Sequence, residues 1–262
     1  MTHLPERKRV LIAVRTYPTP ARKGVEVSCT GGVTQEGEWI RLFPVPYRRM
    51  RPDQQFKKYD WIDVEVTKAS DSRPESFTPN LDSITIVGSV GPEKYWLARK
   101  KLIFPLMSHC LCCLEATRKR QLFPTLGIFK PQVIRRFVIE PDEPAWTPGQ
   151  LAKLQQQSLF NPLPGKDLEK IPFKFKYEFK CDEASCPGHE LSCTDWEIGE
   201  SYRKWKRIYG GNWKAKLKER YETDMILRND THFYVGNLHA YPSTWIIVGL
   251  FYPRSEGTGA TP

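Results

Sequence analysis

Short runs of alternating or wholly apolar residues fill the first part of the chain. Five of them predict β-strands, at residues 9–16, 25–33, 39–45, 61–66 and 84–90. Residues 35–37 are typical of a hairpin turn, and Pro44 and Pro46 indicate that the third strand ends at a sheet edge. So many short strands favour a small barrel or curled sheet, of the general size of OB-like and PUA-like modules.

Longer patterns with helical spacing occur in the remainder, mixed with further strands. An apolar stripe over residues 92–114 predicts a helix that Pro105 interrupts, and Thr147-Pro148 is typical of a helix start. Further strands are expected at 123–139, 171–179, 232–235 and 245–252, helices at 147–159 and from Asp195 onward, and a loop at 161–166.

The proline-rich segment 141–149 is the strongest candidate for a linker. We therefore expect an α+β protein in two parts. The first is a strand-rich, barrel-like N-terminal module at residues 1–142, and the second is a smaller, zinc-containing α+β C-terminal module at residues 147–255. The tail at residues 256–262 is expected to be disordered.

Composition narrows the class of protein. The chain is 40% hydrophobic, enough for a packed core, and contains no stretch near the roughly 20 apolar residues that span a bilayer. Its first residues carry charge without an apolar segment, so we expect a cytoplasmic protein with no membrane partner. Seven cysteines in such a chain favour reduced thiols or metal ligands over disulfides.

Positive charge is placed unevenly along the chain. The segments 47–58, 118–136 and 203–220 together hold 19 Lys and Arg against two acids, although the net charge is only +10. This concentration is typical of a surface that binds a polyanion, but solvated helix faces and loops give the same pattern. The phosphates of DNA or RNA are expected to contact Arg48, Arg49, Arg51, Arg118, Lys119, Arg120, Arg203, Lys204, Lys206 and Arg207.

Aromatic residues accompany two of the basic segments. Trp39 and Arg41 share one face of an expected strand, where they form either a nucleic-acid-binding platform or the rim of the core. The third segment carries four aromatics at helical spacing, which are expected mainly to contact the core: Tyr202, Trp205, Tyr209 and Trp213.

The string CDEASCPGHELSC at residues 181–193 is typical of a zinc site, because thiolates and imidazole are the ligands that zinc prefers. The expected ligands are Cys181, Cys186, His189 and Cys193, with His239 as an alternative fourth ligand. Four protein ligands would make the site structural, whereas three would leave a position for water and catalysis. A second group, Cys110–Cys113, is expected to be ordinary buried thiols at a helix end.

Asp195 and Glu197 follow the cluster and allow two interpretations. They could bind Mg²⁺ or Mn²⁺ as the catalytic residues of a nuclease. Alternatively, Thr194 and Glu197 form a capping box at the start of a helix, which the spacing favours.

Taken together, these patterns favour a nucleic-acid-binding protein whose two modules form a basic groove and whose second module binds zinc. Two alternatives stay open. One is the metal-dependent nuclease, and the other is a zinc-stabilised adaptor whose basic segments bind an acidic protein.

Overall fold

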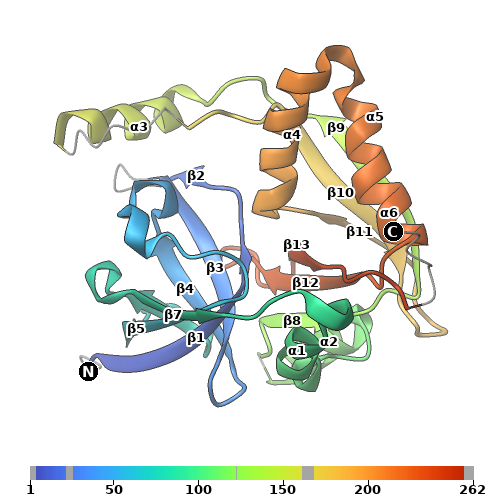
Figure 1. The fold of residues 1–262 in the computed structure, drawn as a ribbon, viewed down its shortest axis with the longest axis horizontal. Coiled ribbons are helices and arrows are strands. Elements are labelled where there is room, and N and C mark those ends of the chain that lie inside the picture. Colours follow the sequence, from blue (N-terminus) through green and yellow to red (C-terminus); the bar gives the residue numbers. More distant parts are fainter. Residues whose placement is uncertain (1–3, 22–25, 122, 161–167, 257–262) are drawn as a thin grey trace. The chain divides into compact units, whose positions relative to one another are not determined.

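Two compact units make up the protein (Figure 1). The computed structural model describes residues 4–21, 26–121, 123–160 and 168–256. The protein is α+β, with a five-stranded β-barrel in the N-terminal unit and mixed helices and sheets in the C-terminal unit, as the sequence predicts. The expected loop at 161–166 lies outside the described residues, as does the expected tail apart from residue 256.

The two units are not contiguous in sequence. The barrel unit consists of Met1–Ser89 and Glu140–Lys174, and the second unit of Val90–Ile139 and Phe175–Pro262, which makes the second unit the larger one. This division differs from the expected boundary at residues 142–147. The reason is that β9 (Val133–Pro141) pairs with β10 (Phe173–Lys180) in one sheet, so strands on both sides of the proline-rich segment belong together.

Five strands close the barrel, in the order β1 (Glu6–Arg15), β3 (Glu26–Thr34), β4 (Trp39–Val45), β6 (Ser76–Pro79) and β5 (Asp60–Lys68). The sheet closes because β5 pairs back onto β1. Closure leaves these strands without open edges. The unit also contains β2 (Thr19–Pro20), β7 (Thr85–Ser89), α3 (Pro148–Phe160) and the short helices η1 (Tyr47–Arg49), η2 (Pro52–Gln54) and η3 (Leu81–Ser83).

Alternating side chains fill the interior of the barrel. Along β5, Ile62, Val64 and Val66 are buried and belong to one apolar cluster, whereas the residues between them are partly exposed. Burying such a side chain stabilises the fold by about 1.5–3 kcal/mol. At Gly32 a Cβ atom would lie 2.5 Å from the backbone oxygen of Leu11, so the close approach of β1 and β3 requires glycine there.

Two three-stranded sheets and two groups of helices build the second unit. One sheet has the order β11 (His189–Ser192), β10, β9, and the other β13 (Trp245–Phe251), β12 (His232–Asn237), β8 (Leu126–Phe129). The helical elements are α1 (Glu93–Ile103), η4 (Phe104–Leu106), α2 (Leu111–Gln121), α4 (Trp196–Tyr209), η5 (Gly210–Asn212), α5 (Trp213–Lys218), η6 (Glu219–Thr223) and α6 (Asp224–Leu227). In Figure 1, α1 and α2 lie on one side of the β8–β12–β13 sheet, and α4 to α6 lie on the other.

A cluster of buried aromatic rings joins the two sheets. Phe129 of β8 and Phe233 of β12 lie 5.6 Å and 5.3 Å, between ring centroids, from Phe179 of β10. Tyr177 of β10 lies 5.0 Å from Phe233 on one side and 5.0 Å from Phe137 of β9 on the other. Each such pair contributes about 0.5–1.5 kcal/mol beyond the area that it buries.

The helix expected over residues 92–114 is broken in the structure. The helix α1 ends at Ile103, Phe104–Leu106 form a tight turn around Pro105, and α2 begins only at Leu111. Proline lacks the amide hydrogen that a continuing helix needs, which accounts for the break. Among the described residues, no helix has both the length and the apolar content needed to cross a membrane.

A buried histidine should make the stability of this unit depend on pH. Burial lowers the pKa of His232, which packs against Phe104 and Phe251. Unfolding restores a pKa of about 6.5, so between that value and the lower folded pKa the unfolded chain binds more protons than the native one. The free energy of unfolding should therefore fall as the pH decreases below about 6.5.

His232→Asn removes this titration and retains a nitrogen near the backbone oxygen of Asp230, 3.0 Å from the imidazole. Urea unfolding of both chains between pH 5 and pH 7.5 should show a shallower acid slope for the variant. Parallel slopes would mean that His232 does not contribute to the loss of stability.

Candidate metal centre

A strand hairpin and the start of a helix bring four ligand-type side chains together. Cys181 follows directly after β10, Cys186 lies in the connecting turn, and His189 opens β11, where it pairs with Phe179. The turn is possible because Gly188 has φ +90°, in the left-handed region that favours glycine. The fourth side chain, Cys112, comes from the first turn of α2.

The geometry of the four side chains suits one metal ion. Their ligand atoms, the Sγ atoms of Cys112, Cys181 and Cys186 and an imidazole nitrogen of His189, all lie within 4.8 Å of one another. Cys112 Sγ is 3.2 Å from His189 Nε2, close to the roughly 3.5 Å that such atoms keep on a tetrahedral zinc with bonds of about 2.3 Å and 2.0 Å. The group could therefore hold a metal such as zinc.

Electrostatics in the cluster also favour a cation. Burial, reinforced by the neighbouring sulfurs of Cys181 and Cys186, raises the pKa of Cys112, and burial raises the pKa of Cys181. Burial acts in the same direction on Cys186, but hydrogen bonds from the backbone of Cys181 and Gly188 outweigh it and lower the pKa of that thiol. A divalent ion would relieve the mutual repulsion of the thiolates and displace their protons.

His189 is prepared to act as a neutral ligand. Burial lowers the pKa of its imidazole, against the opposing charge of Glu115. The ring stacks on Phe179 with centroids 5.2 Å apart, which holds its orientation. Neutral imidazole is the form that binds a metal, so the surroundings of His189 favour coordination.

The fourth ligand differs from the one that the sequence predicts. Cys181, Cys186 and His189 are grouped as expected, but Cys112 completes the set in place of Cys193. The sequence predicts only buried thiols at residues 110–113, because cysteine packs as a small apolar residue. The available signal was compositional, since three of the seven cysteines in the chain fall within these four positions.

Cys193 and His239 lie elsewhere in the unit. Cys193 is buried just beyond β11, where its amide donates to the oxygen of Phe175 at 2.7 Å and its backbone forms a bridge with Ile247. His239 is exposed in the turn between β12 and β13. Neither belongs to the ligand group.

Asp195 and Glu197 make hydrogen bonds that connect the start of α4 to β13 and to the residue that follows it. The two carboxylate oxygens of Asp195 accept from the amides of Glu197 and Leu250, each at 2.8 Å, and Asp195 is the N-cap of α4. Glu197 accepts from the hydroxyl of Tyr252 at 2.8 Å. The cap is therefore one residue later than the expected Thr194, and these bonds favour the capping interpretation over catalysis.

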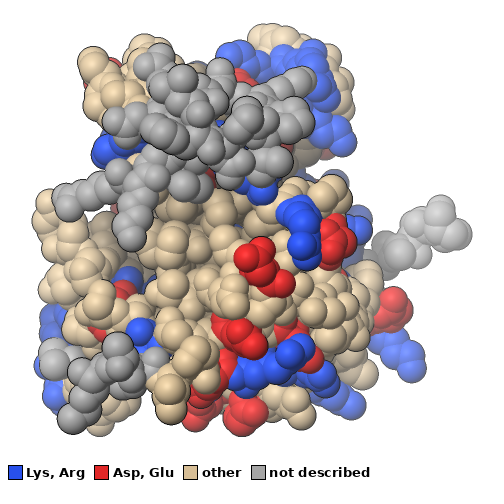
Figure 2. Space-filling model, turned by 90° about the vertical axis from the view of Figure 1, so that its left-hand side faces the viewer, with Lys and Arg blue, Asp and Glu red and all other residues tan. Residues whose placement is uncertain are grey.

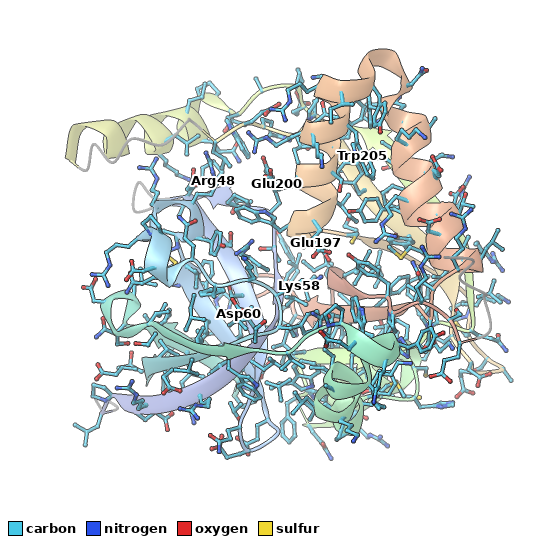
Figure 3. The ribbon with its side chains drawn as sticks, viewed as in Figure 1. Arg48, Lys58, Asp60, Glu197, Glu200 and Trp205 are labelled. Atoms are coloured by element: carbon cyan, nitrogen blue, oxygen red, sulfur yellow. The ribbon has the colours of Figure 1, made fainter. Side chains whose placement is uncertain are left out.

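The third basic segment lies on the exposed side of α4 and α5. Lys204, Lys206 and Arg207 are exposed, whereas Arg203 pairs with Glu200 at 3.0 Å. Figure 3 shows Glu197, Glu200 and Trp205 along α4, with Glu197 near its first turn.

The second basic segment is only partly available to a ligand. Arg118 is buried and its guanidinium donates to the Ser243 hydroxyl at 3.4 Å, while Lys119 and Arg120 are exposed at the end of α2. In Figure 1, α2 lies across the β8–β12–β13 sheet from α4. The part of the second segment on α2 therefore does not share a surface with the exposed side of α4.

Arg41 is buried in the barrel unit and does not lie on an exposed platform of the kind that the sequence suggested. It is buried, and its guanidinium contacts the Glu75 carboxylate at 3.3 Å and the Ser76 hydroxyl at 3.2 Å. A buried arginine needs such partners, because an unpaired charge inside the fold is costly. The Glu75 carboxylate therefore balances its positive charge within the barrel unit.

The first basic segment has carboxylate partners of its own. Arg48 pairs with Glu26 at 3.0 Å and Arg51 with Asp53 at 3.4 Å. Arg49 and Trp39 are partly buried. Figure 2 shows one face of the protein, in the lower part of which basic and acidic side chains lie next to one another.

The fold and the site define a class of protein: a β-barrel joined to an α+β unit that carries a Cys₃His group. The chain belongs to the family described as Domain of unknown function (DUF8757), whose model matches residues 107–261 and so includes all four ligand-type residues. Residues 6–105 match a second model, Domain of unknown function (DUF8758). No curated protein matches the chain.

Replacing Cys112 should abolish stable metal binding, whereas replacing Cys193 should not. Both are partly or fully buried thiols of the same unit, so Cys193→Ser is a matched control for Cys112→Ser. We expect a single zinc ion per chain in the wild type and in Cys193→Ser, and at least tenfold weaker zinc affinity in Cys112→Ser. Metal analysis measures the zinc content, and competition with a chromogenic chelator measures the zinc affinity. Loss of zinc from Cys193→Ser but not from Cys112→Ser would show that Cys112 is not a ligand.

Removing the Asp195 carboxylate should destabilise the second unit. Asp195→Ala loses a helix cap and leaves the buried amide of Leu250 without its acceptor, which together cost about 2–4 kcal/mol. The control Glu200→Ala removes a partly exposed ion pair and should change stability by less than about 1 kcal/mol. Urea unfolding measures the difference, and equal effects of the two substitutions would contradict the capping role.

Proposed function

We propose that the protein binds nucleic acid through the exposed basic side of α4 and α5, and that a zinc ion stabilises the unit that presents this surface. The observation that carries the proposal is the lack of acidic partners for these cations. Within the described part of the chain, no carboxylate pairs with Lys204, Lys206, Arg207 or Lys218, although neighbouring cations do have partners. Unpaired, exposed cations on adjacent helices are available to neutralise phosphates.

The aromatic side chains divide between the core and this surface. Tyr202 and Trp213 are buried and their rings lie 4.9 Å apart, edge to face, so they fix α4 against α5. Tyr209 is 42% exposed at the end of α4, with Lys216 Nζ 5.7 Å from its ring centroid. An exposed aromatic ring among lysines can stack on an unpaired base, which favours a single-stranded or looped partner.

The proposed zinc has a structural role. All four positions of a tetrahedral ion are filled by Cys112, Cys181, Cys186 and His189, so none remains for a reacting water. The ion would join α2 to the β10–β11 hairpin. Together with the capping role of Asp195, this favours a binding protein over a metal-dependent nuclease.

The proposal is tested by neutralising three cations on α4. The variant carries Lys204→Gln, Lys206→Gln and Arg207→Gln, substitutions that preserve helix propensity. A control with Arg7→Gln, Lys101→Gln and Arg254→Gln removes the same charge from exposed positions outside the basic segments. Fluorescence anisotropy with matched DNA and RNA oligonucleotides, single- and double-stranded, measures the affinities.

The α4 variant should bind at least tenfold more weakly than the control at about 50 mM salt. Its plot of log affinity against log salt should also be shallower, by up to about 3 for a double-stranded ligand. Absence of binding by the wild type, or equal losses in the two variants, would overturn the proposal. A loss produced by Lys119→Gln and Arg120→Gln instead would assign the contact to α2.

A further inference from the structure

Two cysteines flank the metal ligand at the start of α2. Cys110 directly precedes the helix and Cys113 lies in its first turn, with Cys112 between them. The Sγ atoms of Cys110 and Cys113 are 2.6 Å apart, and the amide of Cys113 donates to Cys110 Sγ at 3.1 Å. Neither thiol belongs to the Cys₃His group.

A second metal ion is one explanation for this pair, because the Glu183 carboxylate also lies within 4.8 Å of both sulfurs. The distance between the sulfurs argues against it. Two thiolates on one tetrahedral zinc lie roughly 3.8 Å apart, given bonds of about 2.3 Å. The pair at 2.6 Å is much closer, and approaches the bond length of about 2.05 Å in a disulfide.

We infer that Cys110 and Cys113 form a reversible disulfide, a redox site that is separate from the adjacent metal site. The Cys-x-x-Cys spacing at a helix start is the arrangement found in dithiols that cycle between the two states. Cys110 is fully buried, whereas Cys113 is partly exposed, so an oxidant in solution meets Cys113 first. The amide of Cys113 holds Cys110 in position for the second step.

The oxidant is a peroxide. The Cys113 thiolate attacks one peroxide oxygen, which forms an S–O bond, breaks the O–O bond and releases water after protonation. The Cys110 thiolate then attacks the sulfur of this sulfenic acid, which forms the S–S bond and expels hydroxide. Overall, two thiols and one hydrogen peroxide give one disulfide and two waters, and a small dithiol reverses the reaction by exchange.

Oxidation should leave the metal in place, because Cys112 keeps its sulfur. The site therefore predicts a particular pattern of modification in the tryptic peptide 102–118, which contains all three cysteines of this segment. Zinc-loaded protein is treated with stoichiometric hydrogen peroxide, denatured with chelator present, alkylated with N-ethylmaleimide and digested. Zinc content is measured on the same sample before denaturation.

We expect the oxidised peptide to carry one adduct and to lack two hydrogens, and zinc to remain bound. Dithiothreitol before alkylation should restore three adducts. In Cys112→Ser the oxidised peptide should carry no adduct, which identifies Cys112 as the free thiol. Cys113→Ser should not form the disulfide, whereas Cys29→Ser, in the barrel unit, should form it normally.

Three other results would overturn the inference. Three adducts after peroxide would show that the pair does not oxidise. A disulfide that includes Cys112, with release of zinc, would make oxidation a reaction of the metal site. A second zinc ion that protects Cys110 and Cys113 from alkylation in the native state would assign the pair to a metal.

Discussion

The close approach of Cys112 to the β10–β11 hairpin places three thiols and an imidazole at the junction of elements that are far apart in sequence. Burial raises the pKa values of Cys112 and Cys181, and the negative charges of neighbouring sulfurs add to this effect. A cation bound by these side chains would replace that repulsion with bonds that join α2 to the hairpin. The same strand connects this junction to the core of the second unit, because β10 also supplies Tyr177 and Phe179 to the aromatic cluster.

Local patterns in the sequence were sufficient for most of the strands and for three of the ligand-type residues, but they did not predict β6 or β11. The alternation of apolar and polar residues identified β5. Cys181, Cys186 and His189 lie close together in sequence because one turn between two strands brings them together. Cys112 could not be inferred in this way, since its place depends on how α2 packs and no spacing rule connects it to the hairpin. The same reason explains the domain boundary: prolines near residue 145 suggested a linker, but pairing of β9 with β10 is a long-range contact.

The number of basic residues in a sequence segment indicates a polyanion-binding surface less well than their exposure and their partners in the structure do. Arg41 and Arg118 are as basic as their neighbours in sequence, yet both are buried beside polar partners. Arg48 has a carboxylate partner in Glu26. Lys204, Lys206 and Arg207 on the exposed side of α4 lack such partners among the described residues, as do Lys119 and Arg120 at the end of α2, so these cations retain an attraction for external anions. Counting basic residues therefore overestimates the surface available to a polyanion.

The division of the chain between its two units limits how the protein can be shortened. The polypeptide passes from one unit to the other after Ser89, Ile139 and Lys174, so neither unit is one continuous stretch. A fragment that ends at residue 105, where the match to DUF8758 ends, would lack residues 140–174 of the barrel unit. It would also contain α1 without Phe251 and Tyr252, the aromatic residues that contact Trp96 of this helix. Separate production of either unit would therefore require a rejoined or permuted chain.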